Sequence, residues 1–360
     1  MVSVSLCMIV KNEEDVLARC LESAADLVDE IIIVDTGSTD RTREIAARFT
    51  DKVYDFPWRD DFSAARNESF SHASMDYSMW LDADDVLLEE DRKAFLALKE
   101  TLDPAVSVVM APYHAGFDES GHVTFSYYRE RLIKNHGGMR WTGAVHEVVT
   151  PAGRIQYADF AVTHRKTRPS DPGRNLRIYE AQLAAGKTLD PRQQFYYGRE
   201  LYYHRRWKDA LDVFERFLAE GRGWVENEID ACCHCAYCHK ELGHDQAALA
   251  ALFRTFEYDR PRAETCCEIG SWFFQREQYR QAAYWYALAL TCVRDDSRGA
   301  FVSPDCYGYL PCIQLCVCYS RLGNQKRAEV FNELAAACKL DSTAVRRNRA
   351  FFRSLAEQTG

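Results

Sequence analysis

The strongest constraint on the fold is a change of periodicity near the middle of the chain. Up to about residue 165, short apolar runs alternate with amphipathic stretches, which predicts strands alternating with helices in a mainly parallel, doubly wound α/β sheet. From about Pro191 the pattern is helical throughout. The expected elements of the first half are strands at 4–10, 30–34 and 77–81 and helices at 14–25 and 41–49. The chain therefore predicts two domains of different architecture.

The helical half contains a weak internal repeat. It emerges when four alanines are set in register, Ala210, Ala247, Ala282 and Ala328. A small residue precedes each alanine by twelve positions: Gly198, Cys235, Gly270 and Cys316. The intervals between successive alanines of this set resemble those of degenerate tetratricopeptide repeats. The paired helices of such repeats need a small residue at their crossing. The segment 295–311, rich in Gly, Pro, Ser and Asp, is expected to be an inserted loop.

The boundary between the halves is expected in the segment 165–173, which carries two prolines and a glycine. We therefore predict an α/β domain at 1–168, a linker and connecting helix at 169–190, and helical repeats at 191–360.

The composition excludes several classes of protein. A formal net charge of −9 argues against a nucleic-acid partner, because binding phosphates needs a basic face. The apolar runs are far shorter than the roughly 20 residues of a transmembrane helix, and the N-terminus lacks the pattern of a signal peptide. Fourteen cysteines without an export signal predict reduced thiols and a cytoplasmic location.

The cysteine cluster at 232–238 invites a structural zinc site. Zinc spacing, however, usually joins two separated pairs through a loop, and these cysteines fall inside a helical pattern. Packed thiols are therefore the expected state, and zinc is the weaker alternative.

Three of the predicted strands end in polar clusters, at 11–13, 35–40 and 82–85. Ligands of open parallel sheets bind outside the carboxyl ends of the strands, so these clusters predict one shared site. If strand geometry continues past Leu81, Asp82 and Asp84 lie on the same side and can approach one Mg²⁺ or Mn²⁺ ion. The structural alternative is a solvated turn that caps the next helix. Asp35 could accept hydrogen bonds from a nucleotide base or ribose, or simply end a strand.

Four motifs together resemble family 2 glycosyltransferases of the GT-A fold, over roughly residues 1–165. They are Cys7-Met8-Ile9-Val10-Lys11-Asn12-Glu13-Glu14, Val34-Asp35-Thr36-Gly37-Ser38-Thr39-Asp40-Arg41-Thr42, Phe62-Ser63-Ala64-Ala65-Arg66-Asn67 and Trp80-Leu81-Asp82-Ala83-Asp84-Asp85. Four motifs in order are more specific than any one of them. A helical-repeat tail also occurs in a bacterial branch of this family, including relatives that glycosylate peptides.

The resemblance implies roles for these residues in binding a nucleotide-sugar donor. Asp35 would contact the uracil or ribose of a UDP-sugar, and Arg66 would lie near its diphosphate. Asp82 and Asp84 would form the DxD pair that binds nucleotide and metal. The base pocket would be lined by four successive residues, Val10, Lys11, Asn12 and Glu13.

The resemblance also implies an acceptor base and a further metal ligand. Glu147, or its neighbour His146, would take the proton of the acceptor, since a general base needs reach first and a suitable pKa second. His164 ends another apolar run and would complete the metal shell with Asp84, and its imidazole suits Mn²⁺ better than Mg²⁺.

The sequence therefore predicts a metal-dependent, inverting hexosyltransferase that moves sugar from a UDP-sugar to a peptide, protein or saccharide. The helical repeats are expected to bind the acceptor or a protein partner, or to form a homodimer. Two alternatives are a nucleotidyltransferase with the same metal site and a helical-repeat scaffold with an inactive transferase domain. The first usually has a Gly-rich basic loop after its first strand, and residues 11–14 contain no glycine.

Overall fold

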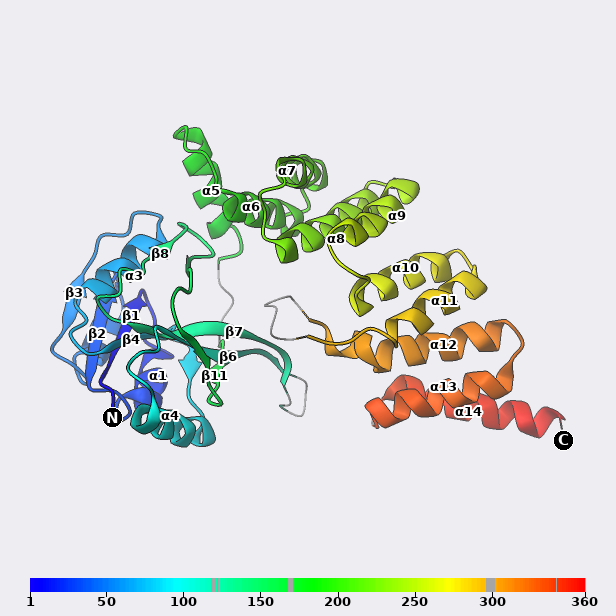
Figure 1. The fold of residues 1–360 in the computed structure, drawn as a ribbon, viewed down its shortest axis with the longest axis horizontal. Helices are drawn as coiled ribbons and strands as arrows, with labels where there is room; N and C mark the ends of the chain where they lie inside the picture. Colours follow the sequence, from blue (N-terminus) through cyan, green and yellow to red (C-terminus); the bar gives the residue numbers. More distant parts are fainter. Residues whose placement is uncertain (118–120, 122, 168–170, 296–301, 341, 360) are drawn as a thin grey trace. The chain divides into compact units, whose positions relative to one another are not determined.

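The computed structural model describes residues 1–117, 121, 123–167, 171–295, 302–340 and 342–359. Two compact units divide the chain (Figure 1), the sheet domain Met1–Thr188 and the helical domain Leu189–Gly360. The predicted α/β and all-helical architectures are both confirmed. The expected boundary segment 165–173 includes residues 168–170, which lie outside the described residues, and the expected limits at 168 and 190 stay predictions.

In the described part of the sheet domain, nine strands form one mixed sheet in the order β3-β2-β1-β4-β7-β6-β11-β5, and β10 pairs with β6. A separate two-stranded ribbon joins β8 to β9. The strands are β1 (Val4–Val10), β2 (Glu30–Asp35), β3 (Val53–Asp55), β4 (Tyr77–Trp80), β5 (Asp85–Val86), β6 (Val108–Phe117), β7 (Val123–Lys134), β8 (Trp141–Thr142), β9 (Val148–Val149), β10 (Ile155–Tyr157) and β11 (Val162–His164).

The first four helices of this domain lie between strands along the chain, as alternating periodicity predicts, and the fifth follows the last strand. They are α1 (Leu17–Ala24), α2 (Thr42–Ala46), α3 (Phe62–Ser71), α4 (Glu89–Thr101) and α5 (Arg174–Ala184). Alternate residues of β1, such as Leu6 and Met8, belong to the large core that also contains Leu17 of α1 and Phe95 of α4. Cys7 faces the other way and packs with residues around the end of α3. Both faces of β1 are covered, which explains why every residue of this strand except Ser5 is apolar.

The sheet is parallel only in part. β3, β2, β1 and β4 run parallel to one another, whereas β7 is antiparallel to both β4 and β6. The doubly wound pattern therefore describes the first four strands in this order, whose carboxyl ends meet at one edge. β4 and β7 are far apart in the sequence. The periodicity of each strand does not indicate whether two such partners pair parallel or antiparallel.

Glu30 anchors the start of β2 with a buried carboxylate. Its oxygens accept hydrogen bonds from the hydroxyl of Ser5 and from Ser74, and they form an ion pair with Lys52. Burial alone would raise the pKa of Glu30, but these donors outweigh it and lower the pKa from 4.5 to about 2. The ionised carboxylate therefore stabilises the folded state.

Glu30→Gln is expected to destabilise the sheet domain by about 3 kcal/mol at pH 7, the equivalent of this pKa difference. The folded-state pKa is depressed, so the contribution is present above pH 4.5 and is lost as the pH falls toward 2. Urea unfolding between pH 7 and pH 3 measures both effects. An unchanged slope of stability against pH in the variant would contradict this role of Glu30.

The described part of the helical domain consists of successive antiparallel helix pairs followed by a further helix (Figure 1). Its first helix begins at a capping box. The backbone amide of Gln193 donates a hydrogen bond to the carboxylate of Asp190, and the backbone amide of Asp190 donates one to the side-chain oxygen of Gln193. The helices are α6 (Pro191–Tyr203), α7 (Trp207–Glu220), α8 (Val225–Glu241), α9 (Asp245–Arg254), α10 (Ala263–Gln275), α11 (Tyr279–Ala289), α12 (Tyr309–Arg321), α13 (Gln325–Cys338) and α14 (Thr343–Thr359). Short 3₁₀ turns lie at η1 (Thr255–Glu257) and η3 (Pro304–Tyr307).

The repeat register is confirmed in three helix pairs and shifted by one residue in the second. Each pair turns through a residue with positive φ, at Arg205, Gly243, Glu277 and Gly323. Five residues after these turns lie the buried alanines Ala210, Ala248, Ala282 and Ala328. The predicted register is therefore wrong at Ala247, because Ala248 is buried and Ala247 is only half-buried. The small residue of the second pair is accordingly Ala236 rather than Cys235.

Close helix crossing explains why these positions are small. A Cβ atom at Gly198 would lie 2.7 Å from the ring of Phe214, and one at Gly270 would lie 3.0 Å from the ring of Tyr286. The expected inserted loop at 295–311 includes η3, and its residues 296–301 lie outside the described residues; the expectation is wrong from Tyr309 onward, because these last residues belong to α12.

All fourteen cysteines are free thiols. Burial raises the pKa of Cys232 and of Cys238 to about 12, which favours the packed thiols expected for this cluster. In the part of the chain that the structure describes, no metal-ligand group includes these cysteines. No helix among the described residues has both the length and the apolar character needed to cross a membrane.

Candidate active site

The candidate site lies where the parallel strands β1, β2 and β4 end. Val10 and Asp35 are partners in register at the ends of β1 and β2. Asp35 is buried, and its Oδ1 accepts hydrogen bonds from the backbone amides of Gly37 and Ser38, both at 2.7 Å. Its Oδ2 is also buried and has no hydrogen-bond partner. Asp35 therefore offers a carboxylate oxygen to a donor that the described protein does not supply.

The loop after β1 is tied to the loop after β2. Asn12 has a φ of 55°, and its amide donates to the hydroxyl of Ser38 at 3.0 Å. The amide of Glu13 donates to the hydroxyl of Thr42 at 2.7 Å, while Lys11 is exposed. The two loops that the sequence predicts for base binding thus form one hydrogen-bonded wall beside Asp35.

The acidic segment 82–85 forms a turn rather than a continued strand. β4 ends at Trp80, and the amide of Asp85 donates to the carbonyl of Asp82 at 3.0 Å. A turn breaks the alternation of side chains, so Asp84 and Asp85 both approach His164, while Oδ1 of Asp82 pairs with Arg66. The premise that placed Asp82 beside Asp84 is therefore not met, although the assignment of Asp82 to the metal remains a prediction.

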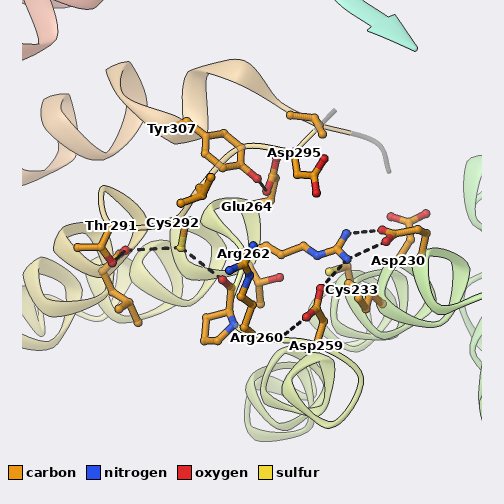
Figure 2. Close-up of a pocket in the computed structure, with 17 residues that line it drawn as sticks. Asp230, Cys233, Asp259, Arg260, Arg262, Glu264, Thr291, Cys292, Asp295 and Tyr307 are labelled. Atoms are coloured by element: carbon orange, nitrogen blue, oxygen red, sulfur yellow. Dashed lines mark hydrogen bonds and ion pairs between the residues drawn. The ribbon is translucent and has the colours of Figure 1, made fainter. Parts of the chain in front are cut away.

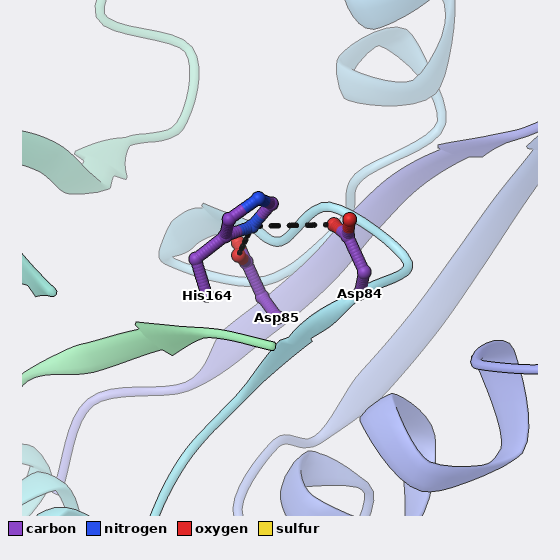
Figure 3. Close-up of side chains that lie close together, drawn as sticks. All are labelled: Asp84, Asp85 and His164. Atoms are coloured by element: carbon purple, nitrogen blue, oxygen red, sulfur yellow. Dashed lines mark hydrogen bonds and ion pairs between the residues drawn. The ribbon is translucent and has the colours of Figure 1, made fainter. Parts of the chain in front are cut away.

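His164 brings an imidazole to this turn, because β11 pairs with β5 and sets His164 opposite Asp85. Its Nδ1 lies 3.4 Å from Oδ1 of Asp84 and 3.3 Å from Oδ1 of Asp85. One ligand atom from each of these three residues lies within 4.8 Å of the others. Figure 3 shows one nitrogen of the imidazole directed toward both carboxylates. Two carboxylates and an imidazole at this spacing can hold a divalent cation.

The electrostatics of the cluster reflect crowded acids. Burial is the largest cause that raises the pKa of Asp84, with the charges of Asp82 and Asp85 adding to it and His164 partly offsetting it. The pKa of His164 is raised chiefly by its hydrogen bond to Asp85, against the effect of burial. A positive charge is therefore favoured at this position.

Asp85 also has a structural role that the sequence left undecided. Its side chain is fully buried, with Oδ1 accepting from the hydroxyl of Tyr113 at 2.8 Å and Oδ2 accepting from the amide of Asp82 at 3.0 Å. The guanidinium of Arg131, also fully buried, lies 3.6 Å from Oδ2. Asp85 thereby fixes the turn, which leaves the oxygens of Asp84 more available to a ligand.

Arg66 joins two of the predicted site residues. From α3 it donates to Asp82 Oδ1 and to Glu147 Oε1, both at 2.7 Å. Its guanidinium lies 4.7 Å from the ring centre of Trp80 and 5.0 Å from that of Trp141, and its buried Nη1 has no partner. Burial opposes ionisation of Asp82, but Arg66 outweighs it and holds the pKa of Asp82 below its usual range. Arg66 was expected near the donor diphosphate, and the structure reveals this additional bridging role.

His146 and Glu147 lie in the loop between β8 and β9. This loop is held on α3, since the amide of Phe62 donates to the carbonyl of Ala144 at 2.9 Å. His146 adopts a φ of 51°, and the side chain of Glu147 is 13% exposed. The structure thus brings Glu147 into the same charged network as Asp82, and the choice of base stays a prediction.

Three arginines surround Trp80, and two of them were not foreseen. Beside Arg66, the guanidinium groups of Arg129 and Arg131 lie 4.7 and 3.9 Å from the Trp80 ring. Arg129 also pairs with the buried carboxylate of Glu130. The available signal was a charged triplet, 129–131, between the aromatic pair Tyr127-Tyr128 and the apolar pair Leu132-Ile133. Charged residues that are buried in this way often lie at functional sites, where their ion pairs fix the positions of neighbouring side chains.

Comparison with known proteins agrees with this geometry. Residues 5–160 match the family described as glycosyl transferase family 2. A TPR repeat-containing protein of Synechococcus elongatus is 40% identical over 149 residues, which is 41% of this chain and 36% of that protein. The SPbeta prophage-derived glycosyltransferase SunS of Bacillus subtilis is 28% identical over 224 residues, 59% of this chain and 52% of that protein.

A third relative is the lipopolysaccharide core biosynthesis glycosyltransferase LpsC of Rhizobium meliloti. It is 28% identical over 159 residues, 42% of this chain and 58% of that protein. The matches therefore span between about a third and three fifths of each relative. Residues 5–160 of this chain form a glycosyl transferase family 2 domain, and a domain of paired helices follows it.

Proposed function

We propose that the chain is a metal-dependent family 2 glycosyltransferase that moves a hexosyl group from a UDP-sugar to an acceptor. The observation that carries the proposal is the convergence at one sheet edge of an unpartnered carboxylate oxygen, a carboxylate–imidazole cluster and a bridging arginine. Glycosyl transfer can use each of these: the carboxylate oxygen accepts a hydrogen bond from the nucleotide base or ribose, the cluster can hold a cation for the diphosphate, and the arginine orients Glu147, a candidate general base for the acceptor.

The nucleotide would bind beside Asp35. Its free Oδ2 suits an N–H of uracil or a ribose hydroxyl, both of which donate. The wall formed by the loop at 10–13 would cover the base. The wholly buried position of Asp35 makes such a hydrogen bond strong, because little water competes for it.

The carboxylate–imidazole cluster fits Mn²⁺ or Mg²⁺. Asp84 and His164 would be its ligands, with Asp85 or Asp82 as the third residue, and Mn²⁺ suits the imidazole better. When bound, the cation supplies positive charge to the departing diphosphate. The protein itself orients these ligands through Tyr113, whose hydroxyl contacts both Asp85 and His164 at 2.8 and 2.9 Å.

The acceptor side would lie near Glu147. Arg66 orients the carboxylate of Glu147 and also pairs with Asp82 on the donor side. One guanidinium therefore fixes the position of the acceptor side relative to the donor side. Glu147 or His146 would remove the acceptor proton, with inversion at the anomeric carbon. The acceptor would be a peptide, protein or saccharide in the cytoplasm, and the helical domain would bind it, bind a protein partner or dimerise.

Asp35→Asn is expected to weaken UDP binding between tenfold and about a hundredfold, the usual value of a hydrogen bond to a charged group. Asparagine keeps an oxygen for the amides of Gly37 and Ser38 and replaces the free Oδ2 with a donor. Titration calorimetry with UDP and Mn²⁺ measures the change. The matched control is Asp55→Asn, at the exposed end of the adjacent strand in register with Asp35. Equal affinities for Asp35→Asn and the control would refute the nucleotide assignment.

A further inference from the structure

The helical domain contains a cavity of about 280 Å³. It is lined by α8, the loop that leads into α10, α10 itself and the end of α11, with Tyr307 of η3 at one side (Figure 2). All of these elements belong to one compact unit. This volume is close to the lower end of the range of volumes found for small-ligand sites. It can hold a long side chain with its flanking backbone.

Carboxylates predominate in the lining of this cavity. Its acidic residues are Glu226, Asp230, Asp259, Glu264 and Asp295, and its basic residues are Arg260 and Arg262. Five negative and two positive groups leave a net charge of −3. Arg262 is already engaged, because its guanidinium pairs with both Glu226 and Asp259. The cavity therefore retains negative charge that its own arginines do not balance.

Asp230 and Glu264 form no ion pair with a lysine or arginine among the described residues, although, against the effect of burial, the charge of Asp230 helps to raise the pKa of Arg199. Oδ2 of Asp230 is buried and accepts no hydrogen bond. The nearest imidazole is that of His234, with Nδ1 at 3.4 Å, but burial lowers the pKa of His234 and favours its neutral form. Glu264 accepts from the hydroxyl of Tyr307 and the amide of Ser303, both at 2.9 Å, and these donors carry no charge.

The remaining walls of the cavity are apolar. Ile229, Pro261 and Leu288 contribute aliphatic surface beside the carboxylates. Lysine and arginine side chains combine an aliphatic stem with a charged head, which is the complement of such a cavity. We propose that this cavity binds a lysine or arginine side chain of a basic polypeptide segment.

A second cavity, of about 350 Å³, extends the site along the same helices. The two cavities share Cys233 of α8 and Glu264 of α10, and the second also includes Tyr237 and Glu268. Successive lining positions on α8 and α10 follow the helix axis, so an extended chain can place neighbouring residues in both cavities. This continuity favours a polypeptide over a small amine. Binding is independent of the sugar chemistry, and only its use to dock an acceptor rests on the proposed function.

The test measures binding of fluorescein-labelled hexa-arginine to the full chain by anisotropy at 150 mM salt. The double variant Asp230→Asn, Glu264→Gln is expected to raise the Kd at least tenfold. The control Asp212→Asn, Glu329→Gln makes the same charge change at exposed positions of α7 and α13 and is expected to change the Kd less than twofold. Because Glu264 also holds Tyr307, the single variant Asp230→Asn is measured too, and thermal unfolding confirms that each variant is folded.

Equal losses in the two double variants would overturn the proposal, since they would reflect general attraction to an acidic protein. Failure of the wild-type chain to bind hexa-arginine would also overturn it. UDP release from a UDP-sugar is measured in parallel. It is expected to be unchanged in the double variant, so failure of the binding site and failure of the transferase assignment give different results.

Discussion

Asp84→Asn is expected to lower the rate of sugar transfer by about a thousandfold, a loss of several kcal/mol of charge stabilisation. Asp84 is the carboxylate of the cluster that is least committed to holding the fold, since Asp85 carries the hydrogen bonds of the turn. Asparagine preserves its shape and removes only the charge. Release of UDP from a UDP-sugar in Mn²⁺ measures the effect.

The matched control for Asp84→Asn is Asp51→Asn, which removes a charge from an exposed position of the same domain. This variant is expected to retain full activity. Mn²⁺-dependent turnover that survives in Asp84→Asn would exclude Asp84 as the essential ligand.

Asp85→Asn is expected to destabilise the sheet domain by about 3 kcal/mol, because it leaves a buried guanidinium without its counter-charge. Arg131 is fully buried, is stacked between the rings of Trp80 and Tyr113, and has two nitrogens, Nε and Nη2, without acceptors. Loss of Asp85 would remove its nearest negative charge. Urea unfolding monitored by tryptophan fluorescence measures the free energy of unfolding.

The double variant Asp85→Asn, Arg131→Met separates loss of charge balance from general disruption. If the ion pair is the cause, removing both charges is expected to restore part of the stability lost in Asp85→Asn. Additive losses in the double variant would show that the two residues act independently.

The strand ends of the site could be predicted from the sequence because they depend on local pattern. The apolar run 4–10 became β1 with its expected bounds, and Asp35 ends β2 as its position after an apolar run indicated. Parallel pairing then places both ends at one edge, a consequence of topology that needs no side-chain detail.

The partners of those residues could not be predicted in the same way. Arg131 and Tyr113 reach Asp85 only because β7 and β6 join the sheet beyond β4, and pairing between strands distant in sequence leaves no local signal. The orientation of Asp82 depended on where β4 ends. Because the strand stops at Trp80 and a turn follows, alternation no longer assigns the side of each acid.

The repeat register illustrates a similar limit. Two adjacent alanines, Ala247 and Ala248, satisfy the small-residue pattern almost equally well. Only the turn, with its positive φ at Gly243, fixes which alanine faces the partner helix.

The most direct test of the proposed function is the product released by the purified full chain. UDP-sugars are screened with Mn²⁺, with EDTA and with EDTA followed by excess Mn²⁺. The account predicts UDP release from at least one UDP-sugar, its loss on chelation and its return when Mn²⁺ is restored. Release of pyrophosphate from a nucleoside triphosphate and a sugar phosphate, or UDP release that EDTA does not change, would contradict it.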